Sequence, residues 1–98
     1  PEFDESIDAY VVCPKQENFA LAFKTAIELR RAGFKVEYDF NGRSMKSQMK
    51  QANKFQAKQV LIFGEDELSR NAVTVRNMAT SEQHEIAVND IISYFNTL

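Results

Sequence analysis

The chain has 98 residues, with 12 Lys or Arg against 14 Asp or Glu, and its formal net charge is −2. This length predicts one domain with one hydrophobic core, and a composition of 44% hydrophobic and 27% charged residues is ordinary for a globular protein. The weak negative charge argues against a generally basic nucleic-acid-binding protein, and no apolar run approaches the roughly 20 residues of a membrane span.

The first part of the chain predicts a strand, a helix and a second strand. Residues 9–13 form a continuous apolar run that stops at Pro14, which is typical of a strand buried on both faces. Apolar residues then recur at helical spacing over residues 17–32, which predicts a helix that ends at a left-handed Gly33. Residues 34–40 alternate between apolar and polar, which indicates an edge strand with one solvent-facing side.

The remaining elements follow in the same manner. The dipeptide Asn41-Gly42 predicts a turn, and Ser44 is placed to cap a helix over roughly residues 44–56. A third strand with a continuous apolar run is expected over residues 59–63. Strands joined through helices run parallel, so this third strand is expected in the sheet centre beside the first. An acidic turn or single helical turn, two hairpin strands and a last helix are expected at residues 65–68, 72–78, 82–86 and 88–97.

These elements predict an α/β fold with three layers, α/β/α. The sheet is expected to be mixed, with about five strands in the order β-α-β-α-β, followed by antiparallel strands and a C-terminal helix. This domain is expected to span residues 8–98. Residues 1–7 are expected to be a lead-in, of which Pro1-Glu2-Phe3 looks like a cloning remnant.

The positive charge of this acidic chain is concentrated in residues 40–64, which hold five basic residues and no acidic one. The rest of the chain therefore holds seven basic residues and all 14 acidic ones. Three lysines of the second helix, four residues apart, share one face and are called the lysine stripe: Lys46, Lys50 and Lys54. A second, apolar face is available for packing: Met45, Met49, Ala52 and Phe55.

The lysine stripe has two interpretations, an RNA-binding surface and an ordinary solvated helix face. Lysine-rich faces are most often simply solvated. Two features favour a polyanion, namely the lack of interleaved acids and the helix N-terminus, where Ser44, backbone N–H groups and the helix dipole suit phosphate. Gln48 and Asn53 are candidates for hydrogen bonds to base edges, because RNA sequence is usually read from splayed single-stranded bases.

Nothing in the sequence indicates a catalytic residue or a metal site. There is no phosphate-binding glycine motif, Cys13 is expected in the core, and His84 is expected to be an ordinary surface or strand residue. Residues 65–67 form an acidic cluster at the end of a strand, where open α/β sheets place their sites. A phosphate-accepting signalling domain would also need carboxylates after the first strand, where Cys13-Pro14-Lys15 stand, so an acidic turn is preferred.

Two segments carry a resemblance to a known family: YDFNGRSMKSQMKQANKFQAKQVLIFGEDEL, residues 38–68, and VTVRNMATSEQ, residues 73–83. They resemble the C-terminal anticodon-binding domain of histidyl-tRNA synthetase, a class II aminoacyl-tRNA synthetase, and the resemblance covers about residues 8–97. Two positions depart from the family pattern. The family often has Asn-Gly where Asn71-Ala72 stand, and Gly where Ser81 stands, and both differences concern local loop shape.

The resemblance implies a tRNA-binding module that docks the anticodon loop of the histidine tRNA. It implies a cytoplasmic, homodimeric parent enzyme, a histidine–tRNA ligase that uses ATP and Mg²⁺ on a separate catalytic domain. No cofactor is implied for this domain. The alternative is a synthetase-like protein-interaction or regulatory domain without a role in aminoacylation.

In the wider family, anticodon bases are met by the loop after the first strand and by the start of the second helix. Together with the cap and the lysine stripe, the matching positions give the expected RNA-binding residues: Lys15, Gln16, Arg43, Ser44, Lys46, Gln48, Lys50 and Lys54. Glu65 and Glu67 are further candidates, as acceptors for the amino groups of bases.

Overall fold

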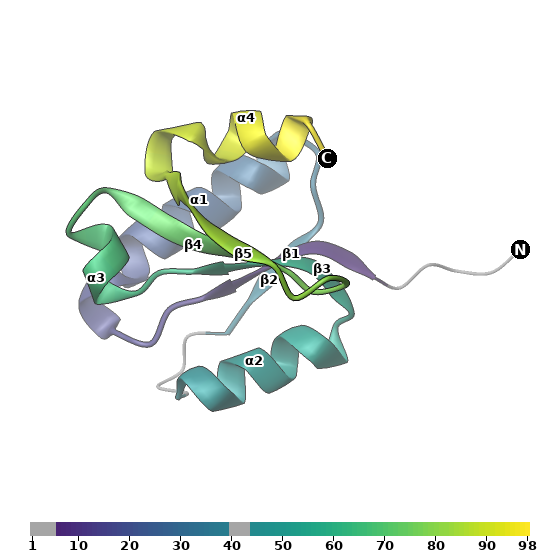
Figure 1. Ribbon diagram of the computed structural model, residues 1–98, viewed down its shortest axis with the longest axis horizontal. Coiled ribbons are helices and arrows are strands. Elements are labelled where there is room, and N and C mark those ends of the chain that lie inside the picture. The colour runs from purple at the N-terminus through teal and green to yellow at the C-terminus, as the bar shows by residue number, and fades with distance from the viewer. Residues whose placement is uncertain (1–5, 40–43) are drawn as a thin grey trace, which may run out of the picture.

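The computed structural model describes residues 6–39 and 44–98, which fold around one sheet (Figure 1). The elements are β1 (Ile7–Val12), a 3-10 turn (Gln16–Asn18), α1 (Phe19–Arg31), β2 (Val36–Tyr38), α2 (Met45–Lys54), β3 (Ala57–Ile62), α3 (Glu65–Leu68), β4 (Ala72–Asn77), β5 (Gln83–Ala87), a second 3-10 turn (Val88–Asp90) and α4 (Ile91–Asn96). The predicted order of elements is confirmed, with boundaries shifted by a few residues. The predicted turn at Asn41-Gly42 and the first five residues of the predicted lead-in lie outside the described residues.

The sheet has the strand order β2-β1-β3-β4-β5. Strand β1 runs parallel to both β2 and β3, whereas β4 and β5 complete the sheet in antiparallel pairs. The mixed sheet, the central third strand and the edge position of residues 36–38 are therefore confirmed. The two strands with the longest apolar runs, β1 and β3, lie side by side in the sheet, because a strand needs cover on both faces to carry apolar side chains on both.

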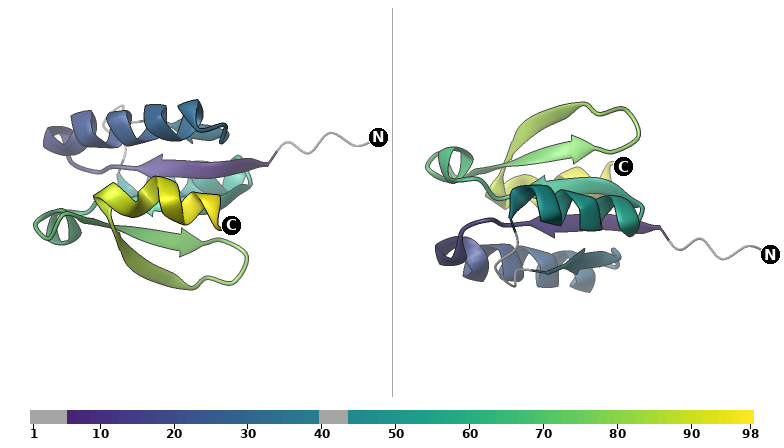
Figure 2. Two further views of the ribbon diagram at one scale, coloured as in Figure 1. Left: turned by 90° about the horizontal axis from the view of Figure 1, so that it is seen from above. Right: turned by 90° about the horizontal axis from the view of Figure 1, so that it is seen from below.

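The helices form two outer layers around the sheet. In Figures 1 and 2, α1 and α4 cover one face and α2 covers the other. The chain moves from β1 to β2 on one side and then back past β1 to β3, so two crossovers of the same hand place α1 and α2 on opposite faces. Side chains such as Leu61 and Phe95 pack in the core under α1 and α4, while Val12 and Val60 pack in the core next to α2.

Two predicted helix caps are present. Gly33 has a φ of 100°, its N–H donates to the Arg30 carbonyl at 3.0 Å, and the next N–H, of Phe34, donates to the Leu29 carbonyl at 3.1 Å. This is the left-handed cap expected at the end of α1. At the start of α2, the Ser44 hydroxyl oxygen accepts the Ser47 N–H at 3.2 Å. The cap fixes where α2 begins and so where the lysine stripe begins.

Candidate nucleic-acid interface

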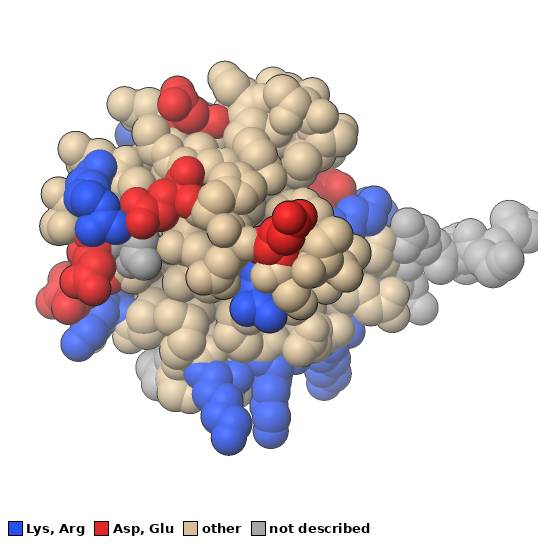
Figure 3. Space-filling view, viewed as in Figure 1, with Lys and Arg blue, Asp and Glu red and all other residues tan. Residues whose placement is uncertain are grey.

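The lysine stripe lies on the solvent side of α2. All three side chains are exposed, and basic side chains project from the side of the molecule that α2 occupies (Figures 1 and 3). The ion pairs of the described residues involve other cations, and no described carboxylate pairs with the stripe. Successive stripe lysines are about 6 Å apart along the helix axis, from four residues at ~1.5 Å rise. The stripe is therefore an uncompensated row of cations.

The loop after β1 brings further polar groups to one end of the stripe. Lys15 and Gln16 are exposed, and Lys15 Nζ lies 3.9 Å from Glu65 Oε1 at the start of α3. Both partners of this pair are more than half exposed, so water and salt screen it and Lys15 remains available to a phosphate. In Figures 1 and 2, the start of α1, the start of α2 and α3 lie at the same end of the molecule. This end carries the carboxyl ends of the parallel strands, where open α/β sheets place their binding sites.

Gln48 is not part of this exposed surface, which corrects the prediction that it reads base edges. Its side chain is fully buried, at 0% exposure. Its Oε1 accepts the Cys13 N–H at 2.8 Å, and its Nε2 donates to the Cys13 carbonyl at 3.1 Å. We call this pair of bonds the Gln48–Cys13 link. An amide that is buried and bonded in this way cannot present its edge to a base.

Helix geometry explains the position of Gln48. It follows Met45 by three residues and precedes Ala52 by four, so it lies in the row of α2 that faces the sheet. Ala52 is fully buried, while Met45 and Phe55 at the two helix ends are 37% and 39% exposed. The predicted apolar face is therefore buried in its middle and open at its ends. A polar residue in an apolar row was the sequence signal for a buried hydrogen-bonding group.

The other predicted site residues fall into two groups. Glu65 is exposed at the same end as Lys15, and Asn53 is exposed near the far end of α2. Arg43 and the side chain of Glu67 lie outside what the structure describes, so the roles expected for them stay predictions.

No catalytic chemistry emerges from the described residues. Cys13 is fully buried, and this burial raises the pKa of its thiol, so the neutral thiol is favoured. The exposed ring of His84 packs against Tyr94 at 5.3 Å between centroids. In residues 6–39 and 44–98, no cluster of His, Cys, Asp or Glu has the arrangement to hold a metal ion. None of the helices in the described part of the chain has the length and apolar content to cross a bilayer.

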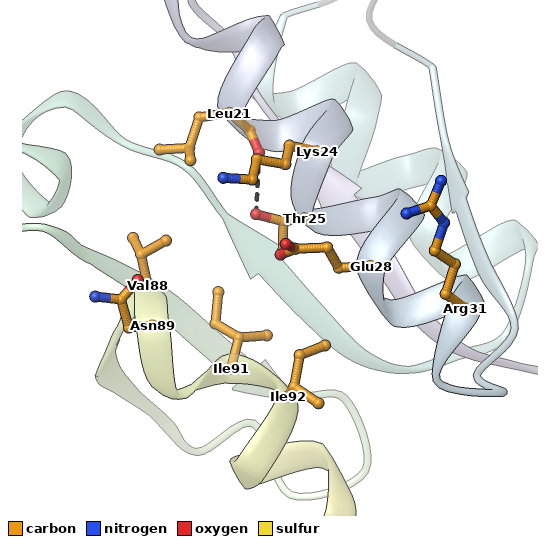
Figure 4. Close-up of a pocket in the computed structure, with 9 residues that line it drawn as sticks. All are labelled: Leu21, Lys24, Thr25, Glu28, Arg31, Val88, Asn89, Ile91 and Ile92. Atoms are coloured by element: carbon orange, nitrogen blue, oxygen red, sulfur yellow. Dashed lines mark hydrogen bonds between the residues drawn. The ribbon is translucent and has the colours of Figure 1, made fainter.

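A groove with a volume of about 380 Å³ lies between α1 and α4, on the face of the sheet opposite to α2 (Figure 4). Leu21, Ile91 and Ile92 form its apolar part, and charged side chains of α1 lie beside it. The Thr25 hydroxyl inside the groove donates to the Leu21 carbonyl of its own helix at 3.0 Å. The Thr25 hydroxyl is therefore already bonded within α1. The candidate site is the other region, the end of the molecule that carries Lys15 and the start of the lysine stripe.

The chain is similar to known proteins over most of its length. A family model described as an anticodon binding domain matches residues 8–98. The chain is 43% identical over 91 residues to histidine–tRNA ligase 2 of Bacillus cereus strain ATCC 10987, which covers 93% of this chain and 22% of that protein. It is 38% identical over 94 residues to the histidine–tRNA ligase of Pyrococcus furiosus, and this match covers 96% of this chain and 22% of that protein.

Solved structures give the same result. The histidyl-tRNA synthetase of S. aureus matches with a TM-score of 0.89 and 33% identity, over 97% of this chain and 28% of that chain. The RNA binding domain of threonyl-tRNA synthetase from Cryptosporidium parvum shares the fold, with a TM-score of 0.83 and 24% identity over 93% of this chain and 23% of that one. The chain spans 22% of the length of the ligases named above. The family model and the ligase matches together confirm the resemblance carried by the sequence segments, and the chain belongs to the anticodon-binding domain family.

Proposed function

We propose that this chain binds the anticodon loop of the histidine tRNA and positions that tRNA for a catalytic domain outside these 98 residues. The observation that carries the proposal is the exposed lysine stripe, which is unpaired with any described carboxylate and begins at the end of the sheet that also presents Lys15. Membership of the anticodon-binding domain family supports it, as do relatives named histidine–tRNA ligases.

The proposed division of labour follows from the chemistry of the side chains. Lys46, Lys50 and Lys15 neutralise phosphates, which gives affinity without sequence information. Gln16 and Glu65, both exposed, offer amide and carboxylate groups to the edges of unstacked bases. The aminoacylation reaction, with its ATP, Mg²⁺ and histidine, belongs to the part of a histidine–tRNA ligase that this chain does not span.

The test is a titration of the chain with a histidine-tRNA anticodon stem-loop and with a stem-loop of scrambled loop sequence, at several salt concentrations. Lys46→Ala with Lys50→Ala is expected to weaken binding and to lower the salt slope by about 1.4 units, from ~0.7 per phosphate contact on a single strand. The matched control is Lys24→Ala with Lys35→Ala, which removes the same charge from exposed positions outside α2.

Each outcome has a distinct meaning. Equal loss in both double variants would show that total charge matters and not the lysine stripe. Equal binding of both stem-loops, or of neither, would contradict anticodon recognition and would favour the alternative, a protein-interaction or regulatory domain.

A further inference from the structure

Gln48 connects the two elements that the proposed interface needs. Its buried amide accepts the Cys13 N–H at 2.8 Å and donates to the Cys13 carbonyl at 3.1 Å, across 35 residues of sequence. Gln48 lies on α2 between Lys46 and Lys50, and Cys13 lies two residues before Lys15. One side-chain amide therefore joins the element that carries the lysine stripe to the loop that carries Lys15.

The link replaces a missing strand partner. Strand β1 pairs with β2 up to the register Val11–Tyr38, where β2 ends. The Val12 carbonyl accepts the Phe63 N–H at 2.9 Å on the β3 side. Backbone groups of successive strand residues point to opposite sides, so Cys13 faces the side that β2 has left. The Gln48 amide supplies one donor and one acceptor there, as a peptide group of a neighbouring strand would.

The position of the loop depends on this link. Pro14, which follows Cys13, has no backbone N–H and its φ is restricted. The direction in which the loop leaves β1 is therefore set largely at Cys13. The Cys13 thiol adds a weak contact, from Sγ to the Lys15 carbonyl at 3.4 Å. Without the link, two buried backbone groups would lack partners, and they would be satisfied only if the loop moved.

We propose that Gln48 is a positioning residue for RNA binding: it holds Lys15 and Gln16 at the spacing from Lys46 and Lys50 that one anticodon loop spans. This inference rests on the proposed function. Gln48 itself touches no nucleotide. Removing the Gln48 amide reduces the contribution of Lys15 to RNA affinity. The lysines of the stripe belong to α2 and keep their contributions to RNA affinity.

The test is a thermodynamic cycle with the histidine-tRNA anticodon stem-loop. In the unmodified chain, Lys15→Ala and Lys50→Ala are each expected to weaken binding about two- to fivefold, the range of exposed ion contacts. Gln48→Met keeps the length of the side chain but removes the amide. In a chain with this substitution, Lys15→Ala is expected to leave Kd for the stem-loop nearly unchanged, a factor of about one. The effect of Lys50→Ala is expected to persist.

A matched control separates positioning from general damage. Gln51→Met makes the same chemical change on the same helix at a partly exposed position, and it should leave both lysine effects intact. If Gln48→Met weakens binding but leaves the Lys15 effect at its full size, Gln48 is only a core residue and the inference is wrong. If the unmodified chain does not prefer the anticodon stem-loop over the scrambled one, the proposed function fails and this inference fails with it.

A measurement on the unmodified chain covers the case in which Gln48→Met does not fold. RNA bound to both sides of the link should oppose its opening, so exchange of the Cys13 amide hydrogen should slow about tenfold at an RNA concentration of ten times Kd. Unchanged exchange at Cys13 under saturating RNA would overturn the inference.

Discussion

Replacing Gln48 with Met is expected to lower the free energy of unfolding by about 2 kcal/mol. The substitution removes both bonds to Cys13 and leaves a buried N–H and a buried carbonyl, each costing about 1–3 kcal/mol when unsatisfied. Burying a thioether instead of an amide offsets part of this loss, because an amide transferred into the core costs about 1–3 kcal/mol by itself. The net cost remains below the 5–15 kcal/mol stability typical of small domains, so the variant should still fold at 25 °C.

The assay is urea unfolding followed by far-UV circular dichroism, since the chain has no Trp to serve as a fluorescent probe. The midpoint should fall while the m-value stays constant, because the same surface is exposed on unfolding. Gln51→Met, on the same helix, should stay within about 0.5 kcal/mol of the unmodified chain. A Gln48→Met chain as stable as the Gln51→Met control would refute the reasoning, because it would mean that the Cys13 groups do not depend on the amide.

Three further predictions concern the scaffold. Gly33→Ala should cost about 1 kcal/mol of stability, or about 4–8 °C in Tm, because a φ of 100° strains a residue with a Cβ even though no atom lies within 4 Å of the added methyl. Burial raises the pKa of the Cys13 thiol, so its stabilising effect is fully present below the ordinary thiol pKa and is lost as pH rises above it. Urea unfolding between pH 7 and 10 should therefore show a steeper alkaline loss of stability than in a Cys13→Ala chain. Glu85→Gln should change stability by less than about 1 kcal/mol in the same assay, since the 2.8 Å pair with Arg70 joins two half-exposed side chains.

The fold was predictable because the apolar pattern and the crossover rule act together. Two short, largely apolar runs, residues 9–13 and 59–63, have the length and composition of strands covered on both faces, and the helices between the strands required parallel pairing. The approach of Lys15 to Glu65 follows from the same topology, because β1 and β3 are neighbours and both side chains come just after them. An alternating pattern likewise placed residues 36–38 at the sheet edge.

The role of Gln48 was not predictable from the features that revealed the lysine stripe. Charge spacing identifies which side chains share a solvent face, but Gln48 is two residues after Lys46, which places it about 200° around the helix and on the opposite side. Its place in the row of Met45 and Ala52 predicts burial. What it bonds to could not be known, because Cys13 lies 35 residues away and is left without a strand partner only where β2 ends.

The segregation of charge explains how an acidic chain can offer a surface to RNA. At physiological ionic strength the Debye length is about 8 Å, so an exposed carboxylate on another face contributes little to the field at a bound phosphate. Stripe lysines about 6 Å apart remain within one Debye length of each other and act together on adjacent phosphates. The net charge of −2 therefore describes the chain from a distance, whereas binding depends on the local row of cations. At 0.01 M salt the Debye length grows to about 30 Å, so the carboxylates on the other faces of the chain also act on the RNA. Their repulsion then opposes the approach of RNA to the lysine stripe.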